Sequence, residues 1–195
     1  MHWHFAPQWR VTQVAPSALR ADRDDAGSVW LLSASPAGAP LDVVIASEDG
    51  SIGWCAPVYG PLVPTTAARQ TISGRAPLYA VTAIVDGVEA ARIDLLPVAG
   101  EAAAHDIAFA IVTSAATEIV LFGWAEDGQV AGRARRVRRV AGIETDARVL
   151  CWREGNGDRG SAAVLIDGST AGRARDAADD PRAAGAATLQ ATGVA

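Results

Sequence analysis

Two histidines near the start of the chain have the spacing of side chains that share one face of a strand. His2 and His4 flank Trp3, and residues two positions apart on a strand point to the same side. Two imidazoles on one face can meet a metal ion or a sugar, although a metal site needs further ligands from elsewhere. His105 precedes Asp106, and neighbours on a strand point to opposite faces. We therefore favour two exposed histidines on a first strand, with no metal and no other cofactor.

The segment from Ile52 to Pro64 carries the aromatic candidates for ligand binding. Its three prolines and two glycines exclude a central strand, because proline lacks the backbone donor of a sheet ladder. The segment must be an edge or a long loop. There Trp54 and Tyr59 could present flat amphipathic faces to a sugar ring. The alternative is that both aromatic side chains fold back and cap the core.

A run of five arginines lies between Gly132 and Val140. On a strand these side chains alternate between the two faces, which does not suit a buried element. The favoured interpretation is an edge strand that charge protects from pairing with other chains. The second is a surface for an acidic polysaccharide, because guanidinium groups match carboxylates bidentately. Together with the aromatic pair, the candidate binding residues are Trp54, Tyr59, Arg133 and Arg135.

Composition and missing motifs exclude several classes of function. The 195 residues carry a net charge of −5, so nucleic acid is not an expected partner. No apolar run reaches the roughly 20 residues that span a bilayer, and no signal peptide is visible, so we expect a soluble protein without a membrane partner. No phosphate loop, dinucleotide fingerprint, zinc motif or nucleophile elbow occurs. The two cysteines, Cys55 and Cys151, are interpreted as buried free thiols, with one disulfide as the alternative.

The apolar pattern predicts an all-β fold. Short alternating or β-branched segments recur between turns rich in glycine and aspartate, without the helices that a parallel sheet requires. The clearest hairpin is expected at Asp86-Gly87, joining 78–85 to 88–96. Strands are also expected at 9–14, 28–32, 41–45, 69–72, 107–112 and 118–122. We predict an antiparallel β-sandwich module over 1–170 and a disordered tail rich in alanine, glycine, arginine and aspartate over 171–195.

Several segments occur in an order that resembles a known family. They are Trp3–Pro7, Ser28–Leu31, Gly53–Gly60 followed by Val63-Pro64, Gly74–Leu78 leading into Val81-Thr82, Gly142–Val149 and Ala163–Gly168. Their order resembles the C-terminal β-sandwich of heparinase II/III-like polysaccharide lyases over about residues 2–170. The most specific of these segments is Gly53–Gly60 with its trailing proline.

The resemblance implies one half of a two-part enzyme. In that family a helical toroid holds the groups that take the proton at C5 of a uronic acid, and the β-domain closes the cleft. Neither the toroid nor the family's histidine-rich catalytic segment has a match here, so no catalytic residue carries over. Because the chain begins with Met1 at a strand inside the family pattern, we expect a truncated or split gene product.

The resulting expectation is a non-catalytic or partial module of a polysaccharide lyase. Its ligand would be a uronate-containing polymer such as a glycosaminoglycan or alginate, and its partner a helical toroid domain or a second copy of the chain. The alternative from another class is a structural or protein-interaction sandwich with no carbohydrate role. A third reading, a complete lyase with an unrecognised site, is the least favoured.

Overall fold

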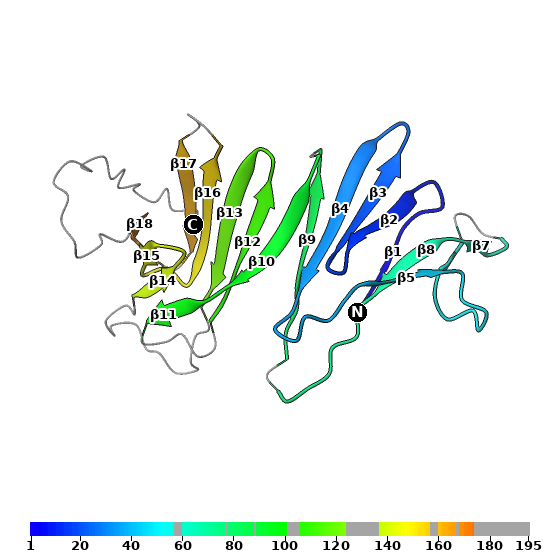
Figure 1. Cartoon of the computed structure of the whole chain (residues 1–195), viewed down its shortest axis with the longest axis horizontal. Coiled ribbons are helices and arrows are strands. Elements are labelled where there is room, and N and C mark those ends of the chain that lie inside the picture. The colour runs from blue at the N-terminus through cyan, green and yellow to red at the C-terminus, as the bar shows by residue number, and fades with distance from the viewer. Residues whose placement is uncertain are drawn as a thin grey trace. The chain divides into compact units, whose positions relative to one another are not determined.

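The computed structural model describes residues 1–56, 60–76, 78–87, 89–100, 106–123, 137–156, 160–166 and 168–173. All regular structure in these ranges is antiparallel β-strand, so the predicted all-β class is confirmed (Figure 1). The chain divides into two compact units, Met1–Ile93 and Asp94–Ala195. The stretch 1–170, predicted as one module, therefore includes parts of both units. Within the described ranges no helix is long and apolar enough to cross a membrane.

The first unit has two sheets and a short ribbon. The three-stranded sheet has the order β1 (His2–His4), β8 (Thr66–Arg69) and β5 (Asp42–Ile45). The four-stranded sheet has the order β2 (Arg10–Ala15), β3 (Ala18–Arg23), β4 (Gly27–Ala34) and β9 (Val81–Asp86). The ribbon pairs β6 (Trp54–Cys55) with β7 (Val63–Pro64). Both sheets supply the core: Leu19 and Leu31 of the larger sheet pack with Leu41 and Ala68, and Trp3, Phe5, Val11 and Val43 pack against them.

The second unit is also a pair of sheets. The five-stranded sheet has the order β10 (Ala91–Leu96), β12 (Ile107–Thr113), β13 (Ala116–Phe122), β16 (Val149–Gly155) and β17 (Ser161–Ile166). The four-stranded sheet has the order β11 (Val98–Gly100), β14 (Arg138–Val140), β15 (Ile143–Thr145) and β18 (Ala171–Arg173). The division between the two units falls within β10.

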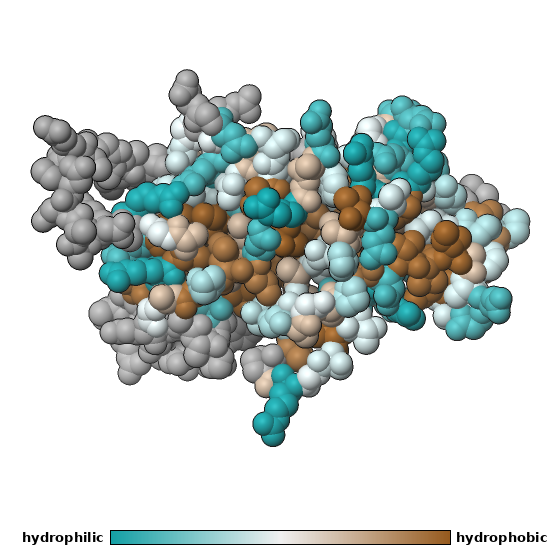
Figure 2. Space-filling model, in the orientation of Figure 1, coloured by the Kyte–Doolittle hydropathy of each residue, from teal (hydrophilic) through white to brown (hydrophobic). Residues whose placement is uncertain are grey.

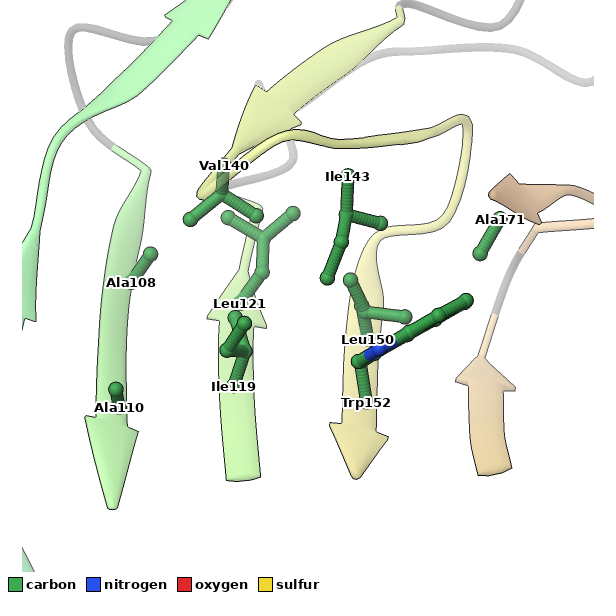
Figure 3. Close-up of a cluster of buried hydrophobic side chains, with 9 residues drawn as sticks. All are labelled: Ala108, Ala110, Ile119, Leu121, Val140, Ile143, Leu150, Trp152 and Ala171. Carbon is green, nitrogen blue, oxygen red and sulfur yellow. The ribbon is translucent and has the colours of Figure 1, made fainter. Parts of the chain in front are cut away.

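The core of the second unit lies between its two sheets (Figure 3). Alternate residues of β12, β13 and β16 point into it, as the period of two of a strand requires. Leu121, Leu150 and Ile143 are fully buried there, and Trp152 is 3% exposed. Each fully buried leucine or isoleucine contributes about 1.5–3 kcal/mol relative to an exposed one. Val140, Ile143 and Ala171 from the four-stranded sheet close the cluster.

The predicted hairpin at Asp86-Gly87 is wrong. β9 pairs with β4, whereas β10 belongs to the five-stranded sheet of the second unit, so these strands are members of different sheets. The Gly87 amide donates to the carbonyl of Ser28 across 3.3 Å, which ties the turn to the β3–β4 hairpin. A two-residue turn signal shows where a strand ends but does not fix its pairing partner.

The predicted strand at 69–72 lies too late in the chain, because β8 ends at Arg69. Gln70 follows β8, its backbone amide donates to the Met1 carbonyl across 3.0 Å, and its side chain is buried. Its Oε1 accepts from the Ser33 hydroxyl across 2.8 Å, and its Nε2 donates to the Ala39 carbonyl across 2.8 Å. These side-chain hydrogen bonds satisfy the buried amide group of Gln70.

Some of the predicted strands rich in β-branched residues expose large apolar side chains. Ile45, Ile84 and Phe122 are 71%, 70% and 48% exposed. Ile45 ends an edge strand, Ile84 lies on the edge strand β9, and Phe122 ends β13.

The predicted disordered tail starts too early. Ala171–Arg173 form β18, which pairs with β15, and Ala171 is 6% exposed within the core. A small apolar side chain and three paired backbone positions keep this segment in the sheet, although its composition resembles that of the following residues. Residues 174–195 lie outside the described ranges.

Candidate functional site

The ribbon that carries Trp54 is held by a glycine that no other residue could replace without rearrangement. Gly53 has a φ of +78°, in the left-handed region. A Cβ on Gly53 would lie 2.4 Å from the Ala46 nitrogen and 2.9 Å from the Thr65 carbonyl oxygen. The Thr65 amide donates to the Gly53 carbonyl across 2.7 Å, so the ribbon emerges directly from the end of β5 and the start of β8.

The indole of Trp54 is fixed by a serine on the preceding turn. Its Nε1–H donates to the Ser47 carbonyl across 3.1 Å. The Ser47 hydroxyl oxygen accepts from the Ile52 amide across 2.9 Å. Trp54 is half-buried. Because its one donor is used internally, Trp54 has only its ring face left to offer a ligand.

The same turn contains a carboxylate that stays charged in acid. Asp49 Oδ1 accepts from the Ser51 hydroxyl, the Ser51 amide and the Ser47 hydroxyl across 2.7, 2.9 and 2.7 Å. These hydrogen bonds, the one from the Ser51 hydroxyl first, lower the pKa of Asp49 to about 2. Asp49 is exposed, and its hydrogen bonds close the turn that supports Trp54.

Exposed apolar residues flank the ribbon along the chain. Ile45 at the end of β5 is 71% exposed, and Leu62 just before β7 is 60% exposed. Figure 2 shows hydrophobic residues gathered over the region of β5 and β8. The surface around the base of the ribbon is therefore apolar as well as aromatic.

His2 and His4 share an exposed face of β1, as predicted. In the sheet register His2 lies opposite Arg69, and Arg69 lies opposite Asp42. The Arg69 guanidinium is 3.6 Å from the Asp42 carboxylate, with both side chains about half exposed. In the described part of the chain, no group of three or more histidine, cysteine, aspartate or glutamate residues is placed to hold a metal ion.

The interpretation of the arginine run as an edge strand is wrong where the structure describes it. β14 lies between β11 and β15, so it is an interior strand. Arg138 points into the unit, with its side chain 8% exposed, and its Nε donates to Asp106 Oδ2 across 2.6 Å. The Asp106 side chain is fully buried. The partner that makes burial of Arg138 tolerable lies 32 positions earlier in the chain, which the run of arginines could not reveal.

A second, more exposed ion pair joins the two sheets of the second unit. Glu154 on β16 accepts from the Trp152 indole N–H across 2.9 Å and from the Arg173 guanidinium. Arg173 also donates to the Ala141 carbonyl across 2.9 Å. The i, i+2 spacing of Trp152 and Glu154 on one strand face was the available signal in the sequence. These charges hold the sheets together, and none of them lies on the Trp54 ribbon.

Both cysteines are free and half-buried, in different units. Burial, and then the Glu118 carboxylate, raise the pKa of the Cys151 thiol. A raised pKa keeps Cys151 in its unreactive protonated form. The thiols are thus free, as favoured, but less buried than expected.

Of the four candidate binding residues, only Trp54 lies in the described ranges. Tyr59, Arg133 and Arg135 lie outside them, so whether they meet Trp54 is a prediction from the sequence.

Comparisons with protein-family models, with curated proteins and with solved structures each find no match to this chain. The class that the fold itself defines is an antiparallel all-β protein with two small two-sheet units. The membership suggested by the segment order stays a prediction.

Proposed function

We propose that this chain is a non-catalytic β-sandwich module that acts by binding, and that its ligand is an acidic polysaccharide of the kind cleaved by heparinase II/III-type lyases. The observation that carries the proposal is Trp54. Its indole N–H donates to the Ser47 carbonyl, the base of its ribbon is tightly packed at Gly53, and the residue is half-buried, so part of it stays open to solvent. A preorganised aromatic face is what a sugar ring binds through its C–H groups.

The charges of the described residues support binding over catalysis. A β-elimination needs a base, an acid and a cation converging on one sugar. The side chains of Arg138 and Asp106 are buried in an ion pair with each other, so they cannot reach a substrate. The charged and imidazole groups at the surface are Arg69, which is half exposed and lies 3.6 Å from Asp42, and the exposed histidines on β1. Within this proposal the reaction itself belongs to a toroid partner.

Binding is tested by calorimetry with alginate and heparin oligosaccharides. We expect Trp54→Ala to weaken binding about tenfold or more, which corresponds to about 1.4 kcal/mol. The matched control is Trp9→Ala, which removes a half-buried tryptophan of the same unit that packs under the Arg23 guanidinium at 5.2 Å. Absence of binding by the unmodified chain, or equal losses in both variants, would refute the polysaccharide ligand.

The non-catalytic part has its own measurement. Incubation of this chain alone with the same polymers should give no rise in the ultraviolet absorbance of unsaturated uronate products. Strong turnover by the purified chain would show that the catalytic groups lie within it.

A protein-interaction module is the second candidate, and the exposed Ile45 and Leu62 favour it. Apolar side chains at the base of the ribbon suit a protein surface better than a polyanion. Salt dependence separates the two functions, because binding of a uronate polymer weakens steeply with ionic strength and apolar contact does not.

A further inference from the structure

We propose that β17 is a docking strand for a second copy of this chain, which pairs with it antiparallel and extends the five-stranded sheet across a two-fold axis. The inference goes beyond the proposed function and does not rest on it. It starts from the edges of the sheets, where unpaired backbone groups accept a further strand.

β17 ends its sheet (Figure 1). It pairs with β16 over six positions, from Val149 opposite Ile166 to Glu154 opposite Ser161. Among the residues that the structure describes, no strand pairs with its other side. One row of amide and carbonyl groups of Ser161–Ile166 is therefore directed away from the sheet.

The other edge strands carry the features that prevent pairing with another chain. β1, β11 and β18 have only three residues each. β2 has Arg10 and a bulge between Gln13 and Ala15. The remaining edge strands carry charged residues: Asp42 on β5, Asp86 on β9, and Arg92 and Asp94 on β10. β17 has the sequence SAAVLI, without charge, proline or glycine. Among the described edge strands of the four larger sheets that are longer than three residues, only β17 lacks a charged side chain.

The side chains of β17 also suit a second copy. Ala163 and Leu165 pack against the core of the unit, so Ala162, Val164 and Ile166 point to the opposite face. Val164 and Ile166 are 62% and 53% exposed. That face continues in two apolar rows across the sheet, Phe122, Val149 and Ile166 in one and Val120, Cys151 and Val164 in the next, whereas the third row places Arg153 and Glu118 beside Ala162.

Self-pairing restricts the register. In an antiparallel pair of two β17 strands, the exposed residues of both copies lie on the same face only if one residue lies opposite its own copy. A shift of the register by one position would turn the exposed side chains of one copy to the face on which the other copy has its core side chains. With Val164 on the axis, Ala162 of one copy lies opposite Ile166 of the other. All three exposed residues of each copy then meet apolar neighbours, and no charge is buried. The arrangement is isologous, as a two-fold dimer requires.

The contact is small, so the dimer should dissociate on dilution. Six paired residues bury less than the ~1,000 Å² that a stable specific interface needs. We expect sedimentation velocity between about 1 and 500 µM to show monomer at the low end and dimer at the high end.

The test substitutes the exposed residue on the axis. Val164→Lys should abolish the dimer over the whole concentration range, because two ammonium groups would face each other. The matched control is Ile84→Lys, an equally exposed isoleucine on the edge strand β9, and it should leave the dimer unchanged. Circular dichroism establishes that each variant is folded. If Val164→Lys fails to fold, Ala162→Lys replaces it.

Charge exchange tests the register itself. Ala162→Glu alone should weaken the dimer at least tenfold, and adding Ile166→Arg in the same chain should restore it, because each carboxylate would then face a guanidinium across the axis. A wild-type chain that stays monomeric, a folded lysine variant that still dimerises, or a charge pair that restores nothing would overturn the proposal.

Discussion

The Arg138 guanidinium and the Asp106 carboxylate form an ion pair of 2.6 Å inside the second unit, with side chains 8% and 0% exposed. Asp106 immediately precedes β12 of the five-stranded sheet, and Arg138 begins β14 of the four-stranded sheet. The pair therefore bridges the two layers next to the apolar core. Its neighbour in sequence, Arg139, pairs with Glu144 across 2.8 Å on the surface, with 65% and 41% of the side chains exposed.

Asp106→Asn should lower the free energy of unfolding by about 3–5 kcal/mol, because it removes the charge of a buried carboxylate that pairs with the buried Arg138 guanidinium. Urea denaturation at neutral pH, followed by tryptophan fluorescence, measures the change. Glu144→Gln is the surface control and should lower the free energy of unfolding by less than about 1 kcal/mol. Similar losses in both variants would contradict the structural role of the buried pair.

Gly123→Ala should destabilise the second unit through Arg138. A Cβ at Gly123 would lie 2.6 Å from the guanidinium carbon and 2.7 Å from its Nε, so the buried arginine must move. We expect the free energy of unfolding to fall by about 1–3 kcal/mol, as it does when a core is overpacked. Gly160→Ala meets nothing within 4 Å and should change stability by less than about 0.5 kcal/mol. A neutral Gly123→Ala would show that the space beside Arg138 is not required.

Gly53→Ala should lower the free energy of unfolding more than Gly27→Ala does, although both glycines have a φ of +78°. The strain of positive φ, about 1 kcal/mol, is common to both. Only at Gly53 would the added Cβ meet backbone, 2.4 Å from the Ala46 nitrogen, whereas Gly27 has open space. Thermal unfolding gives the difference, and a change in tryptophan emission in Gly53→Ala alone would report the displaced Trp54. Equal effects would mean that the ribbon adjusts without strain.

Ser51→Ala should raise the pKa of Asp49 from about 2 toward its usual value of 3.8. The folded-state pKa lies below the unfolded one, so the Asp49 hydrogen bonds stabilise the fold above about pH 4 and are lost as the pH falls toward 2. An NMR titration of the side-chain carboxyl carbons measures the pKa.

Ser28→Ala is the reciprocal control for that titration. The Ser28 hydroxyl, followed by Arg20, is the main cause of the lowered pKa of Asp22. This variant should raise the pKa of Asp22 and leave that of Asp49 unchanged. An Asp49 titration that is insensitive to Ser51 would show that the turn at Ser47–Ser51 is not formed in solution.

Several elements could be predicted because local pattern alone specifies them. The alternation in Arg10–Ala15 and the β-branched runs at Gly27–Ala34 and Ile107–Thr113 gave strands within one or two residues of those observed. Proline excluded a central strand around Trp54, and the observed two-residue ribbon agrees. The shared face of His2 and His4 follows from the period of a strand.

Pairing and burial could not be predicted, because they depend on residues distant in the chain. The turn at Asp86-Gly87 ends β9, but which strands lie beside β9 and β10 is decided by the two cores. The alternation of Arg138 with Arg139 could be predicted from the sequence. That Arg138 is the buried one of the two depends on distant residues such as Asp106, just before β12, which forms an ion pair with it.

The amino-acid sequence alone determined that this protein is built of antiparallel strands, since hydrophobic period, β-branched residues and turn formers act over a few neighbouring positions. The tertiary structure decided how those strands group into two pairs of sheets, which charge is buried, and which of the described strands lies at each edge of a sheet. These outcomes are sums of contacts between residues far apart in the chain, and no local pattern contains them.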